Sequence, residues 1–197
     1  MINGRYMELI KDEYKKSFMA YQQGKPTLAF SSHQPVLVHL LNTIKQGNVL
    51  EFGTGYNSTP LMHIICGLQG RHLTSLETDQ EWFNKFTHYK SESHEMFCME
   101  EKTIREWNDS IFDKKFSIAF IDGAPAELRQ PFIEKIKDNV DYFVVHDTEC
   151  VVESKVNVYA FDFSMFKYVF HFKTQPPMTA VLSNLEEIPE EIKQIFS

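Results

Sequence analysis

The 197-residue sequence lacks most of the features that fix a function at once. It has three cysteines, Cys66, Cys98 and Cys150, and they form no C-x-x-C pair. An odd number of widely spaced cysteines is typical of reduced thiols and argues against a disulfide framework. No apolar run approaches the roughly 20 residues of a membrane span, and the N-terminal residues do not resemble a signal peptide. The sequence therefore predicts a cytoplasmic protein with no membrane partner.

Positive charge is also scarce. The chain has 20 Lys and Arg against 27 Asp and Glu, a formal net charge of -7, which makes nucleic acid an unfavoured partner. In contrast, apolar residues make up 43% of the sequence and include 17 phenylalanines. This content is enough for one sizeable core, so a single domain over residues 1–197 is predicted.

The apolar pattern indicates an α/β fold. Short apolar runs alternate with amphipathic stretches at 57–68, 79–90, 100–107 and 126–138, which predicts strand–helix–strand units and a parallel sheet. The last two runs are joined only by "TQPP", which is too short for a crossover helix, so they form an antiparallel hairpin. We expect a Rossmann-like, doubly wound, mostly parallel seven-stranded sheet. Its strands are 48–52, 71–77, 95–99, 116–122, 141–147, 167–173 and 178–184.

Two helices are expected before the sheet, in residues 1–46. The first covers residues 2–23, and the second follows "FSSH" at residues 30–33 and ends at Gly47. The serines of "FSSH" are expected to cap the second helix. The alternative is that His33 closes over an active site. Within the single domain, residues 1–46 are expected to form part of the acceptor site and residues 47–184 the Rossmann-like core.

Two glycines follow the first strand in "NVLEFGTGYNST". Gly53 and Gly55 lie in the turn between strand and helix, where an open α/β sheet binds its ligands. Asn57 and Ser58 stand at the start of the next helix, whose N–H groups face the same place. A dinucleotide-binding turn has a third glycine where this chain has Ser58. A tight structural turn is the alternative interpretation of such a short motif.

Two acids narrow the choice of ligand. Glu51 comes two residues before Gly53, where it is a poor neighbour for pyrophosphate and a good one for a cation. Glu77 ends the second strand, where a carboxylate can accept hydrogen bonds from both ribose hydroxyls. A ribose combined with a cation and no pyrophosphate describes S-adenosylmethionine.

Four motifs in order resemble one family. "LEFGTG" looks like the E/D-x-G-x-G motif of class I S-adenosylmethionine-dependent methyltransferases. "SLETDQEWF", "FSIAFIDGAP" and "YFVVHDTE" resemble that family's second, fourth and fifth strand motifs. The resemblance covers residues 47–184. It is nearest to small catechol-O-methyltransferase-like enzymes and to O-methyltransferases with an "HDT" fifth strand.

The resemblance implies a set of site residues. Those implied to bind the cofactor are Glu51, Gly53, Thr54, Gly55, Asn57, Ser58, Glu77, Thr78 and Asp122. Asp122, His146 and Asp147 are implied to be catalytic, with His146 or Asp147 taking the acceptor's proton. In catechol-type relatives the acids in the positions of Asp122 and Asp147 hold Mg²⁺. However, this chain lacks the lysine after the fourth-strand acid and has "HDT" in place of the usual Asp-Asn pair, which argues against the metal.

The expected function is S-adenosylmethionine-dependent methyl transfer to a small-molecule or saccharide-like acceptor, at oxygen. Two alternatives stay open: a non-catalytic S-adenosylmethionine-binding or scaffolding protein, and an NAD-dependent oxidoreductase. A homodimer is also left open. Trp82 is expected in the core, with adenine stacking as the alternative. Arg129 is expected on the surface of its helix, with binding of an acidic substrate as the alternative.

Overall fold

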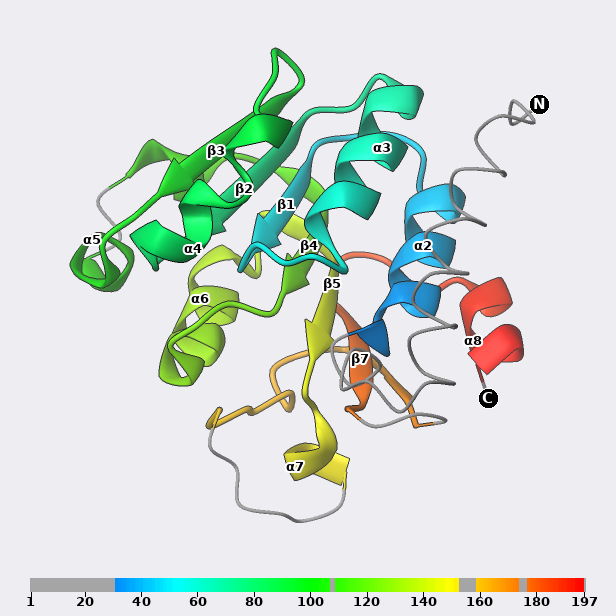
Figure 1. The fold of residues 1–197 in the computed structure, drawn as a ribbon. Helices are drawn as coiled ribbons and strands as arrows, with labels where there is room; N and C mark the ends of the chain where they lie inside the picture. The colour runs from blue at the N-terminus through cyan, green and yellow to red at the C-terminus, as the bar shows by residue number, and fades with distance from the viewer. Residues whose placement is uncertain (1–30, 107–108, 153–158, 174–176, 197) are drawn as a thin grey trace, which may run out of the picture.

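The computed structural model describes residues 31–106, 109–152, 159–173 and 177–196. The helix predicted over residues 2–23 lies outside these ranges. The described part forms one seven-stranded sheet with helices on both faces (Figure 1). Within it, no helix is long and apolar enough to cross a membrane.

The sheet has the order β3-β2-β1-β4-β5-β7-β6. Strands β1 to β5 pair in parallel, and β7 pairs antiparallel with both β5 and β6. The predicted mixed sheet with a C-terminal hairpin is therefore confirmed. The strands are β1 (Val49–Phe52), β2 (Leu73–Glu77), β3 (His94–Cys98), β4 (Phe116–Ile121), β5 (Val140–His146), β6 (Tyr168–Phe172) and β7 (Thr179–Ser183).

The helices differ from the sequence pattern mainly in length. The helix expected over 79–90 is a short α4 (Gln80–Asn84) followed by a 3₁₀ turn (Thr87–Tyr89), because α4 buries no side chain that would hold a longer helix on the sheet. Helix α8 (Glu190–Phe196) was not predicted. The remaining helices are α2 (Gln34–Thr43), α3 (Thr59–Gln69), α5 (Glu101–Glu106), α6 (Arg129–Ile136) and α7 (Glu149–Val152).

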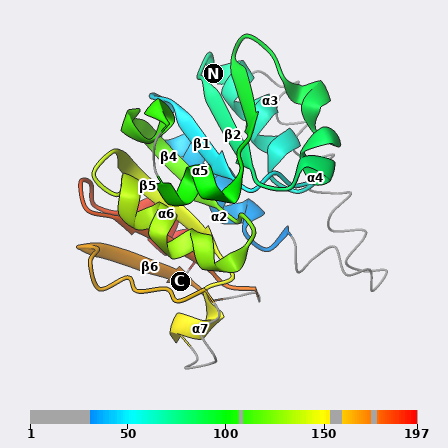
Figure 2. The ribbon, with the colours of Figure 1, turned by 90° about the vertical axis from the view of Figure 1, so that its left-hand side faces the viewer.

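Each face of the sheet has its own apolar core. Side chains of α2, α3 and the segment 188–192 pack on one face, and side chains of α5, the 3₁₀ turn Ser110–Asp113 and α6 pack on the other. Figure 2 shows α5 and α6 in front of the sheet. On their side Phe52 of β1 stacks on Phe132 of α6, with ring centroids 4.2 Å apart. Helix α6 is thereby fixed beside the end of β1.

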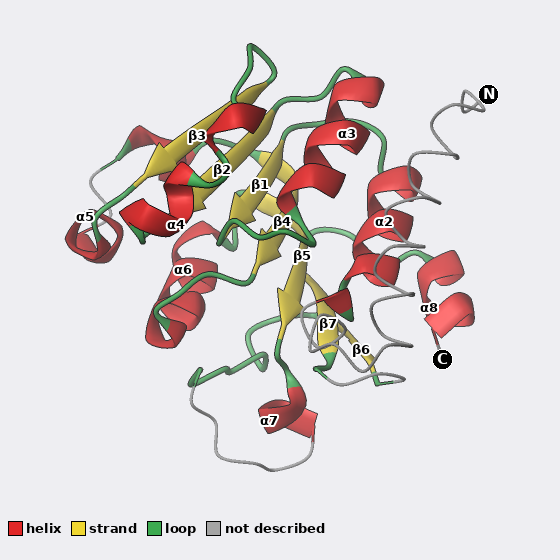
Figure 3. Cartoon of the chain, viewed as in Figure 1, coloured by secondary structure: helices red, strands yellow, loops and turns green. Residues whose placement is uncertain are grey.

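The ends of the parallel strands place the loops that matter for function. The chain passes from β1 outward to β2 and β3, then returns to β4 and β5 on the other side of β1, so the sheet has its switch point between β1 and β4. Because these strands are parallel, the loops that follow them emerge at one edge of the sheet (Figure 3). The two glycines, Asp122 and Asp147 all lie in those loops.

Candidate functional site

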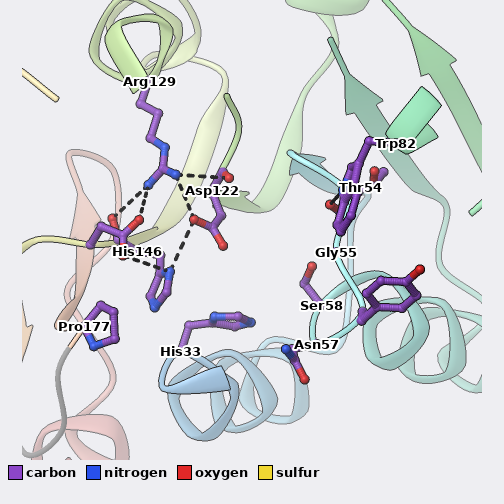
Figure 4. A pocket seen from close by; sticks show the side chains of 12 residues that line it. His33, Thr54, Gly55, Asn57, Ser58, Trp82, Asp122, Arg129, His146 and Pro177 are labelled. Atoms are coloured by element: carbon purple, nitrogen blue, oxygen red, sulfur yellow. Dashed lines mark hydrogen bonds and ion pairs between the residues drawn. The ribbon is translucent and has the colours of Figure 1, made fainter. Parts of the chain in front are cut away.

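A pocket of about 600 Å³ lies at this edge of the sheet. Its lining comes from the loop after β1 (residues 54–58), from Asp122, His146 and Asp147 at the ends of β4 and β5, and from four further residues. These four are His33, Trp82, Arg129 and Pro177. Figure 4 shows the charged side chains gathered at one end and Trp82 with the β1 loop at the other. The pocket thus joins the glycine loop to the acidic strand ends.

The glycine loop requires glycine at its first position. Gly53 has a φ of +95°, which L side chains rarely adopt. A Cβ built on Gly53 would stand 2.5 Å from the Cα of Gly123 in the loop after β4. A Cβ on Gly123 would in turn stand 2.7 Å from the ring of Phe52. The loops after β1 and β4 therefore touch backbone to backbone.

Glu51 supports this loop from behind and does not line the pocket. Its side chain is fully buried and accepts hydrogen bonds from Thr59 Oγ1 at 2.9 Å and Ser75 Oγ at 2.5 Å. Thr59 Oγ1 in turn accepts the backbone N–H of Gly55 at 2.9 Å. Burial raises the pKa of Glu51 to about 7, against the lowering effect of the hydroxyls that bind it. The acid beside the glycines is therefore a structural anchor in this conformation.

Glu77 also turns toward the glycine loop. Its Oε2 accepts both the backbone N–H and the hydroxyl of Thr54, each at 2.9 Å. Its Oε1 accepts the N–H groups of Thr78 and Asp79 at 2.7 and 3.1 Å. A carboxylate has about four acceptor positions, so all those of Glu77 are occupied. Glu77 and Thr78 do not line the pocket.

Arg129 is the centre of a buried charge network, which makes the expected surface position wrong. Its side chain is 8% exposed and lies between two carboxylates, with Nη2 3.0 Å from Asp122 Oδ1 and Nη1 2.9 Å from Asp147 Oδ2. Its Nε donates to the backbone carbonyl of Gly123 at 2.7 Å. Two partly buried acids at the ends of neighbouring strands need a counter-charge when they lie close together, and Arg129 at the start of α6 supplies it.

His146 joins the same network with both ring nitrogens. Its Nε2 lies 2.8 Å from Ser32 Oγ, and that hydroxyl donates to the carbonyl of Pro177 at 2.7 Å. Nε2 must therefore carry the hydrogen. Nδ1 lies 3.3 Å from Asp122 Oδ1 and 3.5 Å from Asp147 Oδ1. Burial lowers the pKa of His146, but the hydrogen bond and charge of Asp122 outweigh it, so the pKa lies above its usual value. These contacts favour the imidazolium form.

Asp122 is held in its anionic form. Burial raises the pKa of its carboxyl, but His146 and Arg129 lower the pKa by more, so it lies below the usual range. Both partners bind the same oxygen, Oδ1. Among the described residues, no donor binds Oδ2. This oxygen is left for a ligand.

The start of α2 differs from the prediction that a serine caps it. The N-cap residue is His33, and no side chain caps the helix. Ser32 instead binds His146 and the Pro177 carbonyl, and His33 forms a wall of the pocket. The proline in the first turn of α2 has no N–H group, so this turn has one donor fewer for a serine to cap. Ser32 is therefore available to bind groups of the site.

Trp82 lies at the opposite end of the pocket, so its expected place in the core is wrong. It is half-buried, and its Nε1 donates to the carbonyl of Thr54 at 2.7 Å. Tyr56, which is 63% exposed, meets its ring edge-on at 5.5 Å between centroids. These two rings give the pocket an apolar rim beside the glycine loop.

The pocket collects most of the predicted site residues. Asp122, His146 and Asp147 line it together with four of the predicted cofactor-binding residues, namely Thr54, Gly55, Asn57 and Ser58. The other four, Glu51, Gly53, Glu77 and Thr78, lie behind or beside the loop. His33 and Arg129, for which the sequence gives a role in the site only as the alternative, also line the pocket.

The charged residues fit a metal ion poorly. Asp122 and Asp147, the pair in the position of a catechol-type Mg²⁺ site, both bind the guanidinium of Arg129. His33, Asp122 and His146 bring two nitrogens and an oxygen within 4.8 Å of one another, but His146 Nδ1 faces Asp122 as a donor. The guanidinium of Arg129 and the protonated ring of His146 thus already occupy the positions that a metal ion would take in these two groups of residues.

Comparison with known proteins supports the fold. No family model matches the sequence, and no curated protein matches it. Among solved structures, the chain is similar to human methyltransferase-like protein 13 in complex with SAH, at a TM-score of 0.58 and 14% identity over 84% of this chain and 88% of that one. It is also similar to a putative caffeoyl-CoA O-methyltransferase from Staphylococcus aureus, at a TM-score of 0.56 and 12% identity over 92% and 99%.

A third similar structure is the N-terminal domain of human METTL16 in complex with SAH, with a TM-score of 0.52 and 13% identity over 81% of this chain and 71% of that one. Identities this low show a shared fold and leave the chemistry to be argued from the residues of this chain. The shared fold is the Rossmann-like sheet of methyltransferases with its antiparallel C-terminal hairpin.

Proposed function

We propose that the chain is an S-adenosylmethionine-dependent methyltransferase that acts on a small-molecule or saccharide-like acceptor, at oxygen. One observation carries the proposal: a single pocket joins the glycine loop after β1 to the partly buried cluster of Asp122, His146 and Asp147. The loop lies at the switch point, where this fold binds ligands, and the cluster lies where a second molecule can approach.

The residues around the glycine loop fit the cofactor. The touching backbones of Gly53 and Gly123 leave no side chain over the loop, so a ligand can approach the main chain. Glu77 stands at the end of β2 as a charged acceptor for ribose hydroxyls. Because its acceptor positions are filled, ribose binding requires it to release the hydrogen bonds to Thr54. Trp82 and Tyr56 offer aromatic surface at the same end.

The other end of the pocket fits an acceptor that carries a hydroxyl group. The cofactor supplies an electrophilic methyl group, so the protein's contribution is chiefly to position the acceptor oxygen for in-line displacement. The free Oδ2 of Asp122 can accept the hydroxyl's hydrogen and orient its oxygen. Arg129 and His146 fix Asp122 by binding its other oxygen. Held on Arg129, Asp147 balances the charge of the cluster.

A direct test is calorimetric titration of the purified protein with SAH and with NAD. We expect SAH to bind and NAD not to bind, because the turn has an acid before it and no third glycine. Binding of NAD alone would refute the proposal and favour the oxidoreductase alternative. Methyl transfer is then measured as SAH released from S-adenosylmethionine in the presence of polyhydroxylated small molecules and oligosaccharides.

The charged acceptor at the end of β2 gives a sharper test. Replacing Glu77 by Ala removes a hydrogen-bonding carboxylate worth about 1.5–3 kcal/mol per bond, so SAH affinity should fall about tenfold or more. Glu81→Ala, which removes an exposed acid from the neighbouring helix α4, is the matched control and should bind normally. Asp147→Ala should leave SAH affinity nearly unchanged and lower methyl transfer. Equal SAH binding by wild type and Glu77→Ala would show that Glu77 serves only the loop.

The filled acceptor positions of Glu77 favour a second candidate, a non-catalytic protein with this fold. In that case the hydrogen bonds between Glu77 and Thr54 persist and the adenosine end of the site stays closed. Calorimetry that shows no SAH binding to the folded protein, together with no transfer to hydroxylated acceptors, supports this scaffolding role instead of an enzyme.

A further inference from the structure

His33 is a buried polar side chain for which the described residues supply no well-formed hydrogen bond. It is 1% exposed, and among the described residues neither Nδ1 nor Nε2 has a partner at hydrogen-bond geometry. The backbone of Asn57 is near enough to raise the pKa of the ring, as the smallest of the four effects on it, but it does not complete a hydrogen bond by geometry. Two unpaired buried nitrogens destabilise a folded protein. A core position of this kind suits phenylalanine better than histidine, so the nitrogens call for an explanation.

Packing fixes the ring in this position. Its centroid lies 4.5 Å from the ring of Phe120 and 4.8 Å from that of His146, which it meets edge-on. In Figure 4 the ring lies between His146 and Asn57 of the β1 loop, below Asp122. One His33 nitrogen and an Asp122 oxygen come within 4.8 Å of each other. Both groups point to the same part of the pocket.

The charge of His33 follows from its surroundings. Burial, and then the charge of His146, lower the pKa of His33 to about 3, and the opposing effects of Asp122 and the Asn57 backbone are smaller. The ring is therefore neutral, with one N–H donor and one acceptor nitrogen. The network beside it is also balanced, because Arg129 and protonated His146 offset Asp122 and Asp147.

We infer that His33 and the free Oδ2 of Asp122 together bind the reacting group of the methyl acceptor, and that this group is an uncharged hydroxyl. One member of the pair accepts a hydrogen bond from the hydroxyl, and an oxygen lone pair remains turned toward the cofactor. As the oxygen–methyl bond forms, the bond from methyl to sulfur breaks and leaves SAH, and the hydroxyl's proton passes to the hydrogen-bond acceptor. A carboxylate or phosphate acceptor would instead face the anionic Asp122 across a network with no spare positive charge. The inference rests on the proposed function.

Sinefungin is a probe of this position that needs no knowledge of the acceptor. It is an S-adenosylmethionine analogue with an ammonium-bearing carbon in place of the methylated sulfonium, whereas SAH has neither methyl nor ammonium there. The ammonium can donate to Asp122 Oδ2 and to His33. Calorimetry should therefore show that His33→Phe lowers sinefungin affinity about tenfold relative to SAH affinity. His39→Gln, on the exposed side of the same helix, should leave this ratio unchanged.

Stability separates a ligand-binding role from a structural one. Phenylalanine keeps the packing on Phe120 and removes the unpaired nitrogens, so His33→Phe should unfold at a higher urea concentration than wild type. His33→Asn, which restores a donor and an acceptor, should recover part of the sinefungin preference.

The inference is overturned if His33→Phe is less stable than wild type, or if its sinefungin-to-SAH ratio equals that of wild type. It is also overturned if His33→Asn recovers none of the preference. Failure of the wild-type protein to bind SAH refutes the proposed function separately. In that event a destabilised His33→Phe shows a structural histidine, and a stabilised one keeps His33 as a ligand-binding residue.

Discussion

Replacing Glu51 by Gln should remove a pH dependence of folding that the buried acid creates. The pKa of Glu51 is about 7 in the folded protein against an ordinary value of 4.5, so ionisation costs the folded state up to about 3 kcal/mol above neutral pH. The raised pKa gives the sign: the acid destabilises progressively as pH rises toward and through 7. Glutamine keeps the shape and cannot ionise. Its amide can still bind the hydroxyls of Thr59 and Ser75.

The measurement is urea unfolding followed by circular dichroism for wild type and Glu51→Gln. Between about pH 5 and pH 8.5, the free energy of unfolding of the variant should rise relative to wild type by roughly 2.5 kcal/mol. Contributions of other groups, including His94, are common to both proteins and largely cancel. The exposed acid Glu81 is the control, since Glu81→Gln should follow wild type at every pH. Parallel curves for wild type and Glu51→Gln would refute a raised pKa at this position.

Three further predictions concern the backbone contact at Gly53, the charge network of Arg129 and the buried ring of His94. Gly53→Ala should lower the free energy of unfolding by roughly 2–4 kcal/mol, because its Cβ meets Gly123 and its φ is positive, whereas Gly67→Ala on the open face of α3 should raise it by about 0.5–1 kcal/mol. Arg129→Met should lower it by up to about 3–5 kcal/mol, since two partly buried carboxylates lose their partner; an unchanged urea midpoint would contradict the charge network. Burial, and then His63, lower the pKa of His94 to about 4, so wild-type stability should fall as pH drops below about 6.5, and His94→Gln should fall less steeply.

The fold was predictable because the apolar runs are long and regular. All six residues of β4 are buried, and the sequence shows this as an apolar stretch in which Ser117 is the one polar residue. The link between β6 and β7 was too short for anything but a hairpin. The helix expected over residues 79–90 is too long, because no side chain of α4 is buried and the fully buried Phe86 lies beyond the end of α4. Tertiary contacts decided this point, and local spacing could not show them.

The site was predictable where it depends on strand ends and less so where it depends on partners. Asp122 and His146 come together because neighbouring parallel strands end at one edge. The position of Arg129 in a polar helix gave no sign that its side chain is buried. The available signal was the pair of acids at adjacent strand ends, because two neighbouring carboxylates require a cation. The role of Ser32 depends on Pro177, which lies 145 residues away in the chain. No local pattern contains such a contact.

The contact between Gly53 and Gly123 has a mechanical consequence. With no side chain between the two loops, their separation is set by the thickness of the backbone itself. The turn that approaches a ligand and the strand end that carries Asp122 must then move as one rigid unit. A change of shape in this pocket would have to come from its opposite wall, the start of α2 and the segment at Pro177, which Ser32 fastens to β5. The glycine pair thus fixes one side of the pocket, and the hydroxyl of Ser32 is the contact that would have to break for the other side to move.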